Sequence, residues 1–122
     1  KLDVGDYSIK GLEHLLVVER KSLGDLWGTL GPRKNHQRFL REWDRCPDGS
    51  LRYLVIEATL ARINKGYKYA PTTSPSNITG KLLSIAVNYN VNIIYGGSSA
   101  ATGDWVKRLC ETVWRWHQLE AK

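Results

Sequence analysis

Acidic and basic side chains that suit phosphate chemistry are concentrated in the first 25 residues. Asp6 follows Gly5, the triplet Glu19-Arg20-Lys21 comes after twelve more residues, and Asp25 comes after a further three. Carboxylate oxygens are ligands that Mg²⁺ prefers, and an ammonium group stabilises negative charge that develops on a phosphate. These residue types predict a site where a divalent cation and a phosphate meet. The alternative interpretation is a solvated strand end, where such charges are commonly found.

Two strands are expected to position these side chains, near residues 2–9 and 14–21. Side chains alternate between the two faces of a strand, so Glu19 and Lys21 should share one face while Arg20 points to the other. If the two strands are neighbours, the Asp6 side chain reaches the same part of the sheet as Glu19 and Lys21. The charges directly follow an apolar run that predicts an internal strand, where an uncompensated charge is costly. This placement favours a functional site over a solvated strand end.

The rest of the chain predicts one α/β domain over residues 1–122, with the element order ββααβαβα. Further helices are expected at 22–30, 33–46, 76–90 and 99–119, and further strands at 51–57 and 91–95. Ser22 and Ser76 have the residue type of helix N-caps, and Asn90 that of a helix end. The stretch from Arg62 to Tyr69 lacks a clear period and is predicted to be irregular.

The last helix carries apolar residues on one stripe that is expected to face the core. The stripe comprises Trp105, Val106, Leu109, Val113 and Trp116. Trp114 lies on the opposite side of the helix from Trp105, because 100° per residue separates them by about 180°. Trp114 is therefore expected at the edge of the core or in contact with a partner.

Composition narrows the class of protein. The chain has 122 residues, of which 42% are hydrophobic and 25% charged, as in a globular domain. Its longest apolar runs are far shorter than the ~18 residues of a membrane span. The net charge of +6 favours a polyanionic partner, with nucleic acid ahead of a membrane surface. The two cysteines, Cys46 and Cys110, lack zinc-ligand spacing and favour a reduced intracellular compartment, cytoplasmic or nuclear.

Two basic groups could contact a phosphate backbone. Arg33, Lys34 and Arg38 lie on the expected helix that follows the candidate site, and Lys65 and Lys68 lie in the irregular stretch. Tyrosines beside Lys68 could stack on an unpaired base. A solvated basic surface is the alternative interpretation for both groups.

The N-terminal segment resembles a known signature. Gly5-Asp6, Glu19-Arg20-Lys21 and Asp25 are similar to the G-D-x(n)-E-R-K-x-x-x-D pattern of the XPF-type nuclease domain, a branch of the PD-(D/E)xK nuclease superfamily. The similarity extends through 33–40, placed like the family's basic helix, through 54–57, placed like its core strand, and through 76–116, which resembles its closing portion.

The resemblance implies a restriction-endonuclease-like three-layer sandwich in which helices flank a central mixed β-sheet. It implies an endonuclease that hydrolyses DNA with Mg²⁺ or Mn²⁺, on branched or flapped DNA. Asp6, Glu19 and the main-chain carbonyl of Arg20 would hold the metal, and Lys21 would be the catalytic lysine. The Arg20 side chain and Asp25 would support the site, although Asp25 equally suits a helix N-terminus. A homodimer or heterodimer is also implied, with Trp114 as an anchor.

Two departures from the family pattern qualify these expectations. The family has an earlier strand with an acidic motif, and this chain starts at Lys1 and contains no methionine, so we expect that it lacks its N-terminal strand and a further acidic ligand. No tandem helix-hairpin-helix pattern follows Trp116. The alternative function is a non-catalytic DNA-binding or scaffold module with the same fold, as in some relatives of this family, although the intact signature residues argue against it. A small basic RNA-binding protein is a third.

Overall fold

A computed structural model describes residues 11–120 of the chain. The expected strand at 2–9, and with it Asp6, lies outside the described residues. Within them, eight elements follow one another, and their bounds are β1 Leu16–Lys21, α1 Leu23–Leu30, α2 Arg33–Asp44, β2 Leu51–Ile56, α3 Leu60–Asn64, α4 Pro75–Tyr89, β3 Asn92–Tyr95 and α5 Ser99–Glu120.

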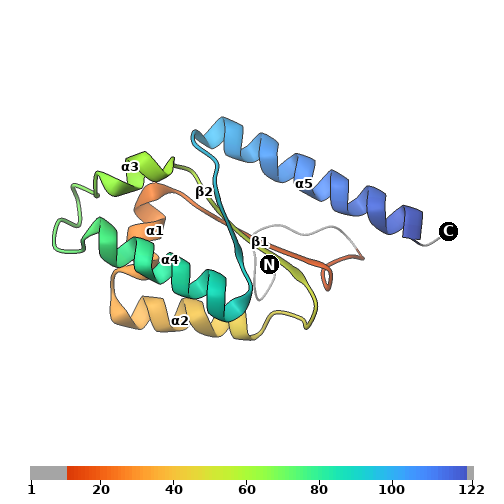
Figure 1. The fold of residues 1–122 in the computed structure, drawn as a ribbon, viewed down its shortest axis with the longest axis horizontal. Helices are drawn as coiled ribbons and strands as arrows, with labels where there is room; N and C mark the ends of the chain where they lie inside the picture. Colours follow the sequence, from red (N-terminus) through yellow and green to blue (C-terminus); the bar gives the residue numbers. More distant parts are fainter. Residues whose placement is uncertain (1–10, 121–122) are drawn as a thin grey trace.

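The three described strands form one parallel sheet in the order β1-β2-β3 (Figure 1). Glu19 pairs with Leu54 in the register of β1 on β2, and Leu54 pairs with Ile93 of β3. The carboxyl ends of parallel strands meet at one edge of a sheet. Lys21, Ile56 and Tyr95 therefore end their strands side by side.

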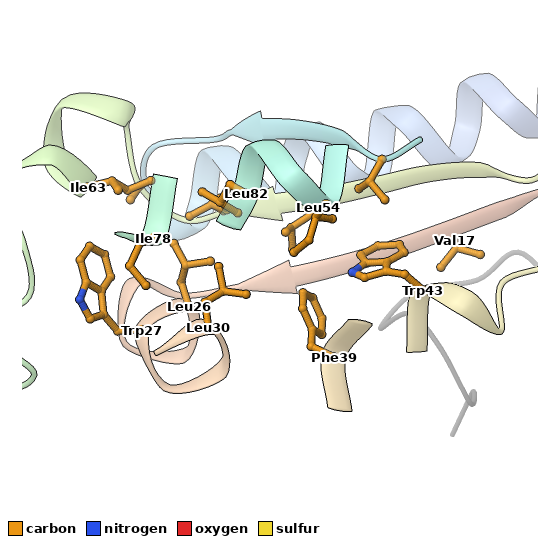
Figure 2. Packing of buried hydrophobic residues seen from close by; sticks show 14 of the residues in the cluster. Val17, Leu26, Trp27, Leu30, Phe39, Trp43, Leu54, Ile63, Ile78 and Leu82 are labelled. Carbon is orange, nitrogen blue, oxygen red and sulfur yellow. The ribbon is translucent and has the colours of Figure 1, made fainter. Parts of the chain in front are cut away.

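Helices cover both faces of this sheet. Val17, Leu54 and Ile56 project toward α1, α2 and α4 and form the larger hydrophobic core with them (Figure 2). Trp27 of α1 and Trp43 of α2 are fully buried there. Leu16, Val18 and Val55 project to the opposite face, where they pack against Val106 of α5. In Figure 1, α5 accordingly runs along the other side of the strands from α2 and α4.

The expected helices and strands form at the predicted places, with bounds that differ by a few residues. Ser22 caps α1 by accepting a hydrogen bond from the Asp25 N–H (3.2 Å), and Asn90 ends α4 in the left-handed conformation at φ 55°. The expected cap at Ser76 is wrong, because Ser74 accepts the N–H of Asn77 instead (3.1 Å). The reason is Pro75, whose fixed φ and missing N–H suit the first helical position, which makes the preceding residue the cap.

One further prediction is wrong in part, and another is wrong. The stretch expected to be irregular is so over 65–69, but residues 62–64 belong to the short helix α3, capped by the Thr59 hydroxyl, which accepts a hydrogen bond from the Arg62 N–H (3.1 Å). Trp116, predicted to lie in the core, is 61% exposed, whereas Trp105, Leu109 and Val113 are partly buried on the predicted stripe. None of the helices described between residues 11 and 120 is long and apolar enough to cross a membrane.

Candidate active site

Glu19 and Lys21 lie side by side at the end of β1. They share one face of the strand, as predicted, and the Lys21 Nζ is 3.8 Å from Glu19 Oε2. Glu19 is only 8% exposed, so its carboxylate is among the few charged groups buried within the described residues. A buried carboxylate is costly unless a cation or hydrogen-bond donors accompany it. The Lys21 ammonium group supplies such a cation.

Lys21 also borders a surface hollow of about 250 Å³ between α1 and α2. Its ammonium group lies over the Phe39 ring, 5.4 Å from the ring centre, which is a cation–π contact. The lining consists of Lys21, Gly28, Thr29, Asn35, Arg38, Phe39 and Glu42. The hollow therefore contains two cations, Lys21 and Arg38, and one carboxylate, Glu42, next to the buried Glu19. Its two cations are suitable donors to an anionic group.

Arg20 occupies the opposite face, again as the alternation of the strand predicts. Its Nε donates to Glu57 Oε2 (2.6 Å), and its Nη2 donates to the carbonyl oxygen of Ser99 (2.7 Å) and to Ser99 Oγ (3.0 Å). Glu57 directly follows β2, and Ser99 begins α5. The Arg20 side chain thus links the ends of two strands to the first turn of the helix that covers them.

The main-chain carbonyl of Arg20 points away from β2. The carbonyl of Leu15 accepts a hydrogen bond from the N–H of Leu51 in β2, and that of Lys21 from the N–H of Glu57 just after β2, at 2.8 Å in both cases. Successive carbonyls of a strand alternate between its two sides, so the Arg20 carbonyl faces the other side of β1. Residues 11–120 contain no group of three or more acidic, histidine or cysteine side chains that could hold a metal by themselves. The buried Glu19 carboxylate and the Arg20 carbonyl are nevertheless hard oxygen donors, which fit Mg²⁺ or Mn²⁺.

Cys46, near the C-terminal end of α2, takes no part in this chemistry as a nucleophile. Burial raises the pKa of its thiol, and the negative charges of Glu19 and Glu42 act in the same direction, while Arg52 opposes them. A thiol with a raised pKa stays protonated at neutral pH and is a poor nucleophile.

Asp25 stands apart from the hollow. It is exposed in the first turn of α1, where its own N–H donates to the Ser22 hydroxyl. An acidic side chain at this position interacts favourably with the helix dipole.

The basic residues divide into two groups. Arg38 lines the same hollow as Lys21, and Arg33 and Lys34 are exposed at the start of the same helix. Lys65 and Lys68 line a different hollow of about 530 Å³ in the segment between α3 and α4.

Three residues near the site were missed by sequence reasoning. Asn35 and Glu42 line the hollow, and they lie three and four residues from Arg38, which puts them on the same face of α2. That spacing is a signal that could have identified them. Glu57 was expected only as a strand residue, and its pairing with Arg20 depends on the register between β1 and β2.

Comparison with known families assigns the class of this protein. The family model of the ERCC4 domain matches residues 1–109, and the chain therefore belongs to the ERCC4 domain family. The resemblance to the XPF-type nuclease domain is confirmed by this match. Membership implies a nuclease-family role related to DNA structure. A comparison with curated proteins finds no match.

Proposed function

We propose that this chain is a divalent-metal-dependent endonuclease that hydrolyses phosphodiester bonds in branched or flapped DNA. One observation carries the proposal: the Lys21 ammonium group lies 3.8 Å from a buried carboxylate and borders the same hollow as Arg38. The family assignment supports the nuclease class, and the net charge of +6 suits a polyanionic substrate.

Oxygen donors from adjacent positions would hold Mg²⁺ or Mn²⁺. The donors are the Glu19 carboxylate and the Arg20 main-chain carbonyl, with the Asp6 carboxylate expected from outside the described residues. When bound, the cation would polarise a phosphoryl oxygen and lower the pKa of a bound water.

The side chains of this chain provide the remaining functions. The Lys21 ammonium group donates to a non-bridging oxygen of the scissile phosphate and stabilises the charge that develops there. Its contact with the Phe39 ring restricts the side chain, so less entropy is lost when the phosphate binds. Arg38 binds an adjacent phosphate and so orients the strand, with Arg33 and Lys34 extending the basic surface along α2. Arg20 and Asp25 support the site as positioning residues.

The proposed function includes a proposed arrangement of layers. A restriction-endonuclease-like three-layer sandwich around a mixed sheet is supported by the position of α5 on one face and of α1, α2 and α4 on the other.

Self-association is supported by Trp114 and Trp116, which are exposed on α5. Sedimentation of the Trp114→Ala/Trp116→Ala variant tests it, because a dimer anchored there would dissociate.

Cleavage of flapped, nicked and plain duplex DNA with Mg²⁺ tests the nuclease proposal. Glu19→Gln and Lys21→Met should each lower the cleavage rate by about 10²- to 10⁴-fold, the range typical for loss of such groups. Lys107→Met, which removes an exposed lysine on α5, is the matched control and should cleave normally. Cleavage that persists in both site variants would refute the proposal.

The alternative function, a non-catalytic DNA-binding or scaffold module, gives a different set of results. DNA affinity would then fall steeply with salt while calorimetry detected no binding of divalent cations and no DNA was cut. An RNA-binding protein would instead prefer RNA over DNA of equal length in competition.

A further inference from the structure

A second hollow, separate from the candidate active site, combines positive charge with an aromatic ring. It has a volume of about 530 Å³ and is formed by the segment that connects α3 to α4. Among residues 11–120 its lining contains no acidic residue and comprises Arg62, Lys65, Gly66, Tyr67, Lys68, Pro71, Thr73 and Pro75, and Tyr69 adjoins it through Tyr67 and Lys68. Three cations without a carboxylate among them favour an anionic ligand.

Two tyrosines beside these cations differ in burial. Tyr67 is partly buried against Trp27 of α1, with the ring centres 6.0 Å apart. Tyr69 meets Tyr67 edge to face, with ring centres 5.4 Å apart, and is 73% exposed. The Lys68 Nζ lies 4.9 Å from the centre of the Tyr69 ring. The structure thus presents an accessible aromatic ring that contacts a partly buried neighbour and has the Lys68 ammonium group over one face.

The segment is held in place by hydrogen bonds rather than by its exposed side chains. The Ala70 N–H donates to the Tyr67 carbonyl (3.0 Å), and the Thr73 N–H donates to the Ala70 carbonyl (3.2 Å). The Trp27 indole N–H donates to the Thr73 carbonyl (3.1 Å), which fixes the segment to α1. A ring that is positioned before binding loses little conformational freedom when a ligand stacks on it.

These features point to single-stranded rather than double-stranded DNA. Single-strand binding sites combine a basic groove for the backbone with aromatic rings on which bases stack. The faces of paired bases are shielded by their neighbours in a duplex, whereas unpaired bases expose them. Tyr69 would therefore add affinity only for an unpaired segment, while Lys65 and Lys68 would contact phosphates of either form.

The helix α1 borders both this hollow and the candidate active site. Gly28 and Thr29 line the hollow that contains Lys21, whereas Trp27 holds Thr73 and a Cβ at Gly24 would come within 2.9 Å of the Tyr67 hydroxyl. Its eight residues span about 12 Å, which is less than one turn of B-DNA. One DNA molecule could therefore contact both sites.

We propose that the Tyr69 ring and the cations Arg62, Lys65 and Lys68 bind an unpaired branch of the DNA substrate. The proposal rests on the proposed function, because it assigns a place to the single-stranded part of a flapped substrate. It makes Tyr69 a residue that selects the substrate and takes no part in hydrolysis.

The test measures binding of a fluorescent 15-nucleotide oligo(dT) and of a duplex hairpin to the full chain, in EDTA so that no metal is required. Tyr69→Ala should weaken oligo(dT) binding about five- to tenfold, the lower part of the range for loss of one stacked base, and change hairpin binding less than twofold. Tyr69→Phe keeps the ring and should bind like the unaltered chain. Leu83→Ala, which removes an exposed apolar side chain on α4, is the control and should have no effect.

Salt dependence tests the role of the cations. Lys65→Gln and Lys68→Gln should each reduce the log–log slope of oligo(dT) affinity against salt by about 0.7, because each removes one phosphate contact. An unchanged slope would overturn the assignment of these lysines.

Three results would overturn the proposal. Tyr69→Ala could leave oligo(dT) affinity unchanged, Tyr69→Phe could lose as much affinity as Tyr69→Ala, or polyglutamate could compete as well as oligo(dT), which would indicate an acidic protein partner. If Tyr69 is dispensable while Lys21→Met abolishes cleavage of flapped DNA, the inference alone fails. If Tyr69 selects unpaired DNA while no substrate is cut, the inference stands and the proposed nuclease function fails.

Discussion

The Arg20–Glu57 pair allows a quantitative prediction that separates a structural from a catalytic role. Arg20→Met removes a guanidinium group that donates to Glu57 Oε2, to the Ser99 carbonyl and to Ser99 Oγ at 2.6–3.0 Å. The two charged side chains are only 19% and 21% exposed, so the substitution leaves a largely buried carboxylate without this partner. We therefore expect a loss of folding stability greater than that for a surface ion pair.

The magnitude follows from the burial. Exposed pairs contribute about 0–1 kcal/mol, and removal of one partner from a fully buried pair costs about 3–5 kcal/mol. At one-fifth exposure we expect about 2 kcal/mol for the pair, and about 1 kcal/mol more for the lost link to the first turn of α5. For a domain of this size, that total corresponds to a fall in Tm of about 10 °C.

Urea denaturation of Arg20→Met, Glu57→Met and the double variant measures the pair directly. The double-mutant cycle should give a coupling energy of about 1–2 kcal/mol, because both single variants remove the same contact. Arg20→Lys should recover at most half of the loss, since an ammonium group lacks the planar fork that reaches Glu57 and Ser99 together. Arg115→Met on the exposed side of α5 is the matched control, with a change below about 0.5 kcal/mol.

A coupling energy near zero, with Arg20→Met as stable as the unaltered chain, would refute this reasoning. If that variant also lost DNA cleavage, Arg20 would act on the substrate and not on the fold. A parallel loss of stability and cleavage, restored in part by lowering the temperature, is the result expected for a positioning residue.

Three further predictions concern other parts of the fold. Burial lowers the pKa of His36, so the unfolded chain binds a proton at this side chain at a higher pH than the folded chain does. The stability of the domain should therefore fall as the pH drops below about 6.5. Urea midpoints should show this fall, and a smaller one in His36→Gln. Cys110 should react with a thiol reagent before Cys46, because Cys46 is buried and Cys110 only partly so; equal rates in the folded chain would contradict this. Gly96→Ala should destabilise the domain by about 1–3 kcal/mol, because its Cβ would press on Thr102 Oγ1, and Thr102→Ala should recover part of the loss.

The faces of the charged residues were predictable because the alternation of a strand is fixed by its backbone. Glu19 and Lys21 share a face and Arg20 points to the other, which requires no knowledge of neighbouring elements. The partner of Arg20 was not predictable in this way. Glu57 is 37 residues away in the sequence, and the two meet because β1 and β2 pair in a parallel register in which the Glu57 N–H donates to the Lys21 carbonyl (2.8 Å).

The hollow beside Lys21 depends on packing between helices. The helical spacing of Phe39, Leu40 and Trp43 predicts the apolar stripe of α2, of which Phe39 and Trp43 are buried and Leu40 is partly buried. It does not specify how α2 crosses α1, which decides that Asn35 and Glu42 face the lysine. Crossing angles depend on side-chain ridges of both helices, so such a site emerges only once the helices are packed.

The error at Trp116 has a simple geometric cause, which also bears on self-association. At 1.5 Å per residue, the 22 residues of α5 span about 33 Å, whereas the six residues of β2 span about 20 Å at 3.3 Å each. The periodicity correctly predicts which residues share the inner side of the helix, but the described strands are shorter than the helix. Trp116 and Leu119, in its last turns, are exposed among the residues that the structure describes, and Trp114 on the other side of the helix is 46% exposed. A second copy of the chain that covered Trp116 and Leu119 would complete this stripe, so Trp116→Ala should weaken the dimer while Tm measured on the monomer stays unchanged. Trp114→Ala, on the opposite side of the helix, tests whether Trp114 is a second anchor.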